Sequence, residues 1–187
     1  GRNFNLRPLD FFGPFGLSHF RRGEAMVKPN SSRIFEAPVW GQPAVIPQRY
    51  RNVTPSTHRY VSQRLSLSYV TWGTPDRPPL FLIHGGRDNA RSWDWIAAAL
   101  CEKWYVIAPD LRGFGNSGVT EGTVTMEQFA DDLNLLLDAL DITEPVTYCG
   151  LSMGGYIGWQ FVRKYPDRLK ALIFCDTKAS ADTPEGV

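Results

Sequence analysis

The sequence predicts an α/β fold, with a mostly parallel sheet and flanking helices, preceded by an extended segment rich in proline and aromatic residues. From about residue 61 onward, short apolar runs alternate with helix-like segments, which is the pattern of parallel strands joined by helices. Residues 1–60 instead hold seven prolines and no sustained helical or strand period. With 187 residues, of which 43% are hydrophobic and 21% charged, the chain suffices for one globular domain with a core.

Five segments after residue 60 have the patterns of strands. Residues 65–70 alternate between apolar and polar side chains, as a half-buried strand does. The other four runs are almost continuously apolar, as is typical of strands buried on both faces of a parallel sheet. They span residues 80–83, 105–108, 146–149 and 171–175.

Helix signals lie between these runs. Thr125 and Gln128 form a capping box, and the apolar side chains that follow recur on one helical face. Ser92 is expected to cap an earlier helix that turns five apolar side chains inward. These are Trp93, Trp95, Ile96, Ala99 and Leu100.

The N-terminal part differs from the rest in charge as well as in pattern. Residues 1–60 are expected to form an extended basic arm with a net charge of +6, and residues 61–187 a folded domain with a net charge of −5. The many aromatic residues of the arm favour packing along a surface of this chain or of a partner, and a disordered leader is the alternative. Its arginines are scattered rather than clustered, which argues against nucleic acid as a partner.

Three motifs that carry chemistry follow predicted strands, at the sheet edge where α/β proteins bind ligands. The first is H-G-G at residues 84–86, and the second is D-x-R-G-x-G-x-S at residues 110–117. The third is G-x-S-x-G-G at residues 150–155, with Ser152 at the tip of the predicted turn. A serine on a sharp, glycine-dependent turn between a strand and a helix is the nucleophile elbow of serine hydrolases.

Together these motifs resemble the α/β-hydrolase superfamily, and more narrowly its esterase, lactonase and epoxide-hydrolase branch. The resemblance covers about residues 61–187, as a partial domain with a truncated α/β-hydrolase fold that reaches the start of the lid. It implies that Ser152 attacks an acyl carbonyl while the backbone N–H groups of Met153 and Gly86 bind the oxyanion. A serine rather than an aspartate at this position favours ester, thioester, lactone or amide hydrolysis over epoxide or haloalkane chemistry.

The resemblance implies roles for four further residues. Asp176, after the last predicted strand, stands where some family members carry the triad acid, and a carboxylate that organises the loop is the alternative. His84 is expected to hydrogen-bond the backbone of the oxyanion loop and not to act as the triad base. Asp110 and Arg112 are expected to tie loops together rather than to act in catalysis.

The departure from the family lies after Ser152, because no histidine follows it before Val187. The family order is nucleophile, acid, histidine, so the chain as given is expected to be catalytically incomplete. The same truncation is expected to leave the strand at 171–175 as an exposed apolar sheet edge.

Three functions remain open at this point. The first is part of a working serine hydrolase that acts on a small acyl-ester-type substrate. The second is an inactive accessory or structural subunit of a larger complex, a pseudoenzyme that contacts other protein subunits through the arm and the exposed sheet edge. The third is a ligand-binding module without catalysis.

Other classes of function find no support in the sequence. It holds no phosphate loop, metal-ligand cluster or dinucleotide fingerprint, so no cofactor or metal is expected. No apolar run has the length of a membrane span. Cys101, Cys149 and Cys175 are far apart in the chain and are expected to be buried free thiols, as in an intracellular protein. The arginine-rich, acid-poor arm fits an organelle such as the mitochondrion, with the cytoplasm as the alternative.

Overall fold

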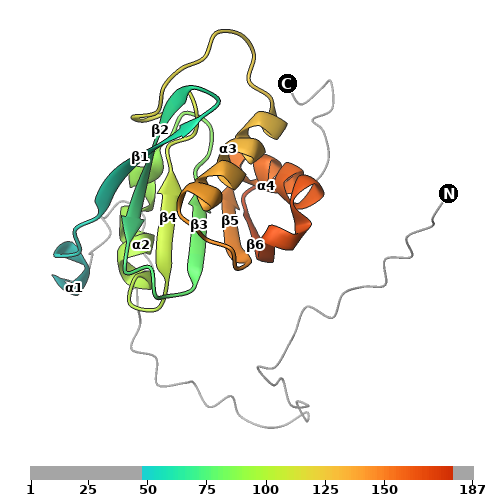
Figure 1. Cartoon of the computed structure of the whole chain (residues 1–187). Helices are drawn as coiled ribbons and strands as arrows, with labels where there is room; N and C mark the ends of the chain where they lie inside the picture. The colour runs from blue at the N-terminus through green and yellow to red at the C-terminus, as the bar shows by residue number, and fades with distance from the viewer. Residues whose placement is uncertain (1–47, 179–187) are drawn as a thin grey trace, which may run out of the picture. The chain divides into compact units, whose positions relative to one another are not determined.

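The computed structural model describes residues 48–178, which belong to one unit of the chain, Phe35–Val187. Six strands form one sheet in the order β1-β2-β4-β3-β5-β6 (Figure 1). The strands are β1 (Ser56–Ser62), β2 (Leu65–Trp72), β3 (Pro79–Ile83), β4 (Tyr105–Pro109), β5 (Val146–Leu151) and β6 (Leu169–Cys175). β4, β3, β5 and β6 run parallel, whereas β2 pairs antiparallel with β4 and β1 pairs antiparallel with β2. The predicted α/β class with a mostly parallel sheet is confirmed.

Helices cover both faces of this sheet (Figure 1). They are α1 (Gln48–Arg51), η1 (Ala90–Trp93), α2 (Asp94–Leu100), α3 (Met126–Ala139), α4 (Met153–Lys164) and η2 (Pro166–Arg168). α3 and α4 pack on one face of the sheet, and η1 with α2 packs on the other. Within residues 48–178, no helix has both the length and the apolar character needed to cross a lipid bilayer.

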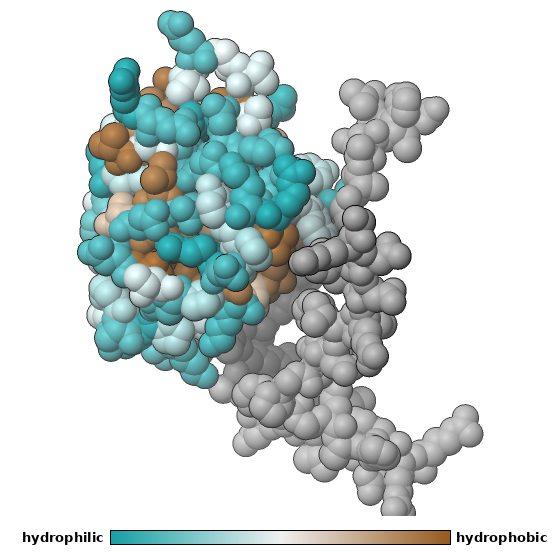
Figure 2. Space-filling model, turned by 45° about the vertical axis from the view of Figure 1, so that its right-hand side comes forward, coloured by the Kyte–Doolittle hydropathy of each residue, from teal (hydrophilic) through white to brown (hydrophobic). Residues whose placement is uncertain are grey.

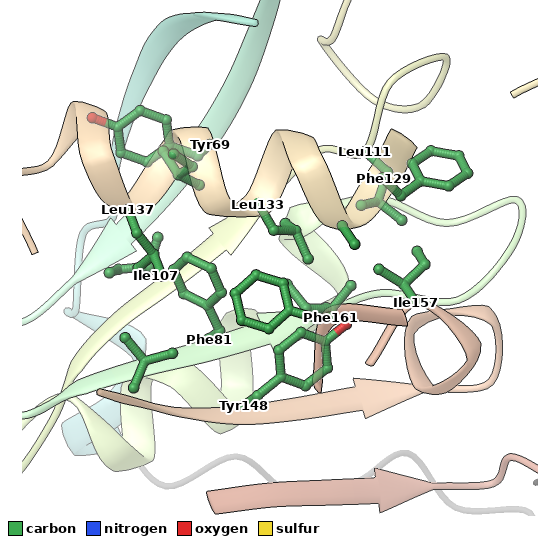
Figure 3. Close-up of a cluster of buried hydrophobic side chains, with 14 of the residues drawn as sticks. Tyr69, Phe81, Ile107, Leu111, Phe129, Leu133, Leu137, Tyr148, Ile157 and Phe161 are labelled. Carbon is green, nitrogen blue, oxygen red and sulfur yellow. The ribbon is translucent and has the colours of Figure 1, made fainter. Parts of the chain in front are cut away.

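The larger core lies between the sheet and the pair α3 and α4 (Figure 3). Phe81, Ile107 and Tyr148 reach into it from the three central strands, and Leu133 and Phe161 meet them from the two helices. The capping box predicted for α3 is present, because the Thr125 side chain accepts the Gln128 N–H and the Gln128 side chain accepts the Thr125 N–H. The packing of Phe161 against Tyr148 holds α4 on β5.

The smaller core, on the α2 face, corrects one expectation. Asn89 rather than Ser92 is the cap, and it precedes η1, a 3₁₀ turn, rather than the α-helix. Trp95 and Ile96 are exposed instead of buried. The buried residues of this segment include Trp93, Ala97 and Cys101, which are spaced by four and therefore share one helical face. The prediction placed the large apolar side chains in the core, whereas helical spacing decides which residues of this segment face the sheet.

The first strand crosses the boundary expected at residue 60. Residues 1–47 of the expected arm lie outside the described residues, but residues 56–60 belong to β1 and pair with β2. β1 lies at one edge of the sheet and buries only Tyr60 and Ser62. A strand that is exposed on both faces over most of its length carries no apolar alternation, which is why the sequence pattern does not reveal it.

The opposite edge of the sheet is β6, which among residues 48–178 pairs only with β5. Ile173 on this strand is 46% exposed, and the exposed Trp159 ring of α4 stacks on Phe174 with 4.5 Å between ring centroids. Figure 2, turned to bring this side forward, shows brown apolar areas among the teal hydrophilic surface. Within the described part of the chain, the predicted exposed edge is therefore present.

Candidate active site

Ser152 occupies the turn between β5 and α4. Its backbone has φ 48° and ψ −112°, a conformation that side-chain-bearing residues rarely adopt and that costs free energy. Its N–H donates to the Cys175 carbonyl over 2.9 Å, and its own carbonyl accepts the Gly155 N–H and the Thr177 hydroxyl, each over 2.9 Å. These bonds hold the strained turn, and the side chain remains exposed. The predicted strand–turn–helix geometry is confirmed.

Two glycines of this motif are required by close backbone approach. A Cβ atom on Gly150 would lie closer than 3.0 Å to the Gly154 carbonyl oxygen, and a Cβ on Gly154 would lie closer than 3.0 Å to the Ile83 carbonyl oxygen. Real Cβ atoms essentially never approach other atoms so closely. The two glycines therefore allow α4 to start directly against the ends of β3 and β5, which brings Ser152 beside the loop that follows β3.

The loop of residues 84–86 lies against the Ser152 turn. A Cβ on Gly85 would be 3.4 Å from the Ser152 Cβ, and a Cβ on Gly86 would be 3.9 Å from the Met153 Sδ. Met153 is the first residue of α4, so its N–H is one of the helix-terminal donors that lack an acceptor inside the helix. The structure thus brings Ser152, Met153 and Gly86 together, while their catalytic roles stay predictions.

His84 is held in one tautomer beneath this loop. The Leu111 N–H donates to its Nε2 over 3.1 Å, so Nε2 is an acceptor and the proton resides on Nδ1, which donates to the Gly85 carbonyl over 2.7 Å. Burial lowers the pKa of His84, although the Gly85 bond and the carboxylates of Asp110 and Asp88 oppose this. Both ring nitrogens are engaged and the ring is buried, as expected for a residue that positions the loop.

Asp110 connects three loops around the site. Its carboxylate accepts the Ala90 N–H over 2.8 Å and the Asn116 N–H over 2.9 Å, and its carbonyl accepts the Ser117 hydroxyl. Ser117 in turn accepts the Ser68 N–H over 2.8 Å. The side chain is almost fully buried. These contacts are those of a residue that organises loops, as predicted.

Arg112 forms a buried ion pair with Asp132, a partner that the sequence analysis did not predict. Its Nε and Nη2 donate to the two carboxylate oxygens of Asp132 on α3, each over 2.6 Å, and both residues are only 2% exposed. The Ser62 hydroxyl also donates to this carboxylate, and the Tyr60 hydroxyl to the Asp132 carbonyl. One signal in the sequence could have indicated such a pair. Asp132 lies beside the apolar face of the predicted helix, where a buried charge requires a partner.

The backbone of Asp176 lies beside the Ser152 turn, although the two residues are far apart in the sequence. Its neighbours Cys175 and Thr177 make the two hydrogen bonds to Ser152 described above. It has φ 45°, again a rare conformation for a residue with a side chain, and it is exposed. The structure thus brings the predicted acid and nucleophile to the same edge of the sheet, and the role of Asp176 stays a prediction.

An open groove of about 600 Å³ lies at the other end of the parallel strands. Its lining includes Pro79, Trp104, Pro145 and Leu169, which stand at or before the starts of β3, β4, β5 and β6. Ser152 follows the carboxyl end of β5, so this groove is distinct from the candidate active site. Among residues 48–178, no group of three or more His, Cys, Asp or Glu side chains could hold a metal ion.

Comparison with known proteins agrees with this geometry. A family model described as alpha/beta hydrolase fold matches residues 78–186. The chain belongs to the α/β hydrolase family. It is 35% identical over 118 residues to 3-oxoadipate enol-lactonase 2 of Acinetobacter baylyi, a match that covers 63% of this chain and 44% of the relative.

Solved structures of other α/β hydrolases resemble the chain as well. A thermophilic esterase from Thermogutta terrifontis is 41% identical, with a TM-score of 0.62 over 71% of this chain and 48% of the esterase. Epoxide hydrolase A from Mycobacterium thermoresistibile is 31% identical, with a TM-score of 0.61 over 65% of this chain and 39% of that enzyme. The chain therefore spans less than half the length of each of these relatives.

Neither described histidine of this α/β hydrolase is placed to activate Ser152. His84 has both ring nitrogens in hydrogen bonds to the backbone. His58 lies on β1, four strands away from β5, which at about 4.8 Å per strand is about 19 Å. It is held there by Thr71, at 3.0 Å, and stacks on Tyr69. His19 lies outside the described residues.

Proposed function

We propose that this α/β hydrolase segment carries the nucleophile and oxyanion hole of a serine hydrolase that cleaves esters, thioesters or lactones. One observation supports the proposal above all. Ser152 is exposed at a strained turn, directly before the first N–H groups of α4 and against the loop that contains Gly86. Backbone strain of this kind persists only where surrounding contacts hold it, and it clusters at functional sites.

The proposed reaction is acyl transfer through the serine. The Ser152 Oγ attacks the substrate carbonyl carbon, its proton passes to a base, and the carbonyl oxygen becomes an oxyanion. The N–H groups of Met153 and Gly86 donate to that oxygen, and the positive end of the α4 dipole favours the same charge. Collapse of the intermediate expels the alcohol, thiol or ring oxygen with a proton from the base. Water then releases the acid and restores the serine.

The identity of the nucleophile decides among the chemistries of the relatives. The similar proteins include an esterase, an enol-lactonase and an epoxide hydrolase. An elbow serine suits acyl substrates, because it attacks a carbonyl whose developing charge falls on an oxygen within reach of the backbone donors. We therefore assign the acyl chemistry of the esterase and the lactonase to this site, rather than epoxide opening.

The acid and base complete the proposal. Asp176 is the proposed acid, since Cys175 and Thr177 hold it beside Ser152. The proposed base is a histidine from the part of the fold that the chain does not span. Removal of one triad member costs several orders of magnitude in rate. We therefore propose the activity for the polypeptide in which the rest of the fold accompanies residues 1–187.

A fluorophosphonate probe, which reacts with activated serines, tests this proposal. We expect the complete natural polypeptide to be labelled on the peptide that contains Ser152, and Ser152→Ala to abolish the labelling. Ser56→Ala is the matched control, because Ser56 is exposed on β1 at the far edge of the sheet. Labelling that persists in Ser152→Ala, or a folded natural polypeptide that is never labelled, overturns the proposal.

A second candidate function rests on the β6 edge. The strand pairs on one side only within residues 48–178, and its apolar surface includes Ile173 and Phe174 beside Trp159. Such an edge binds another strand readily, which suits an accessory subunit as well as the missing half of a hydrolase. A natural polypeptide that is unlabelled and purifies only with stoichiometric partner subunits favours this candidate. A labelled monomer excludes it.

A further inference from the structure

Two of the three cysteines meet directly beneath the Ser152 turn. Cys149 on β5 and Cys175 on β6 have their Sγ atoms 3.7 Å apart, although 26 positions separate them in the chain. Both pack in the smaller core, on the α2 face of the sheet. Both are free thiols, and Cys175 is the more exposed of the two. Two thiols at van der Waals separation form a redox-active pair more readily than isolated cysteines do.

We propose that Cys149 and Cys175 form an oxidation-sensitive dithiol that closes to a disulfide and disturbs the Ser152 turn. The oxidant is a hydroperoxide. It transfers one oxygen atom to the Cys175 thiol, which gives a sulfenic acid and leaves the corresponding alcohol, or water from hydrogen peroxide. The Cys149 sulfur, which lies 3.7 Å from the Cys175 sulfur, then loses its proton and attacks the sulfenic acid. The S–S bond forms, and the sulfenic hydroxyl leaves with that proton as water.

The environment of each thiol sets this order of events. Cys149 is 9% exposed, and burial, followed by the contact with Cys175, raises the pKa of its thiol to about 12. Since peroxides react with the thiolate form, Cys149 is a poor first target. Cys175 is half-buried at the outer strand, where a small peroxide can reach it. Cys149 is then the nearest thiol to resolve the sulfenic acid.

Strand register couples the disulfide to the elbow. Cys149 stands opposite Ile173, and Cys175 stands opposite Leu151, so the two cysteines are diagonal neighbours rather than a direct pair. A disulfide bond of about 2.0 Å requires the two sulfur atoms to approach by about 1.7 Å. β5 is held by β3 and β6, whereas β6 is held only by β5 within residues 48–178. The end of β6 is therefore the part that moves.

That movement reaches Ser152 through two hydrogen bonds. The Cys175 carbonyl accepts the Ser152 N–H, and Thr177, two residues further on, donates to the Ser152 carbonyl. Because these bonds hold the strained conformation of the turn, a shift of Cys175 weakens at least the first of them. Oxidation thus loosens the backbone that presents the proposed nucleophile. The effect of oxidation on activity rests on the proposed function, whereas the predicted change in the Ser152 turn does not.

Peptide mapping after oxidation tests the disulfide itself. The protein is treated with hydrogen peroxide under native conditions, remaining thiols are blocked, and tryptic peptides are analysed without reduction. Each cysteine lies on a separate tryptic peptide, 92–103, 113–163 or 171–178. We expect a cross-link between 113–163 and 171–178 that dithiothreitol removes. A cross-link that involves peptide 92–103, or none at all, overturns the proposal.

Variants and hydrogen exchange test the coupling. Cys101→Ser is the matched control, because Cys101 directly follows α2 and its Sγ donates to the Ala98 carbonyl. The cross-link should persist in this variant. Cys175→Ser and Cys175→Ala should each lose the cross-link. We expect the Ser152 amide to exchange several-fold faster after oxidation and to recover on reduction. A cross-linked protein with unchanged exchange at Ser152 overturns the coupling, whether or not the protein is an active hydrolase.

Discussion

Removal of the Asp132 carboxylate should be among the most destabilising single changes in this fold. In Asp132→Ala, the Arg112 guanidinium keeps its charge in a site where both residues are 2% exposed, and it loses two hydrogen bonds of 2.6 Å. The Ser62 hydroxyl loses its acceptor as well. Breaking a buried ion pair by removing one partner costs about 3–5 kcal/mol. We expect a loss of that size in the free energy of unfolding.

Urea unfolding measures this loss. With a slope of about 1–3 kcal/mol per molar, 3–5 kcal/mol lowers the midpoint by about 1 M or more. The double variant Arg112→Met with Asp132→Leu is the control, because it removes both charges and keeps apolar volume, so it should be more stable than Asp132→Ala. A loss below about 1 kcal/mol in Asp132→Ala, or a double variant that is less stable than the single one, refutes the reasoning.

Three further changes probe the elbow and the loop beside it. Gly154→Ala places a methyl group against the Ile83 carbonyl and should cost about 1–3 kcal/mol and abolish fluorophosphonate labelling; a stable, labelled variant contradicts the packing argument. Ser152→Gly should abolish labelling yet stabilise the fold by about 1 kcal/mol, because glycine accepts positive φ without strain; equal or lower stability in urea means that the turn stores no strain. The lowered pKa of His84 means that the unfolded state binds the proton more tightly. Neutral His84 should therefore contribute to the free energy of unfolding above a pH of about 6.5, and this contribution should be lost as the pH falls below that value. His84→Gln should remove this pH dependence of stability, whereas the control His58→Gln should keep it.

The central strands and the elbow could be predicted from the sequence because their signals are local. β3 and β4 are buried along their whole length, and only apolar runs satisfy that environment. The Thr125 capping box is likewise decided by residues three positions apart. At the elbow, close backbone approach demands glycine at Gly150 and Gly154, so the requirement appears in the sequence as a spaced motif.

The features that escaped prediction depend on contacts between distant segments. β1 is an exposed edge strand, held by backbone pairing to β2 rather than by an apolar face. Asp132 pairs with Arg112, which lies 20 positions away in the sequence. Cys149 contacts Cys175 only because of the register between β5 and β6. No local pattern encodes such pairs. A buried charge on a helix shows that a partner must exist, but it does not show which residue that partner is.

The central claim is that Ser152 is an acyl-transfer nucleophile, and trapping the acyl-enzyme tests it most directly. The complete natural polypeptide is mixed with an activated acetate ester, quenched in acid within the first turnover, and digested. We predict an acetyl group on Ser152 in the tryptic peptide 113–163, formed as fast as the first equivalent of alcohol is released. Ester hydrolysis at an unchanged rate in Ser152→Ala, or acetylation confined to other residues, would contradict the account.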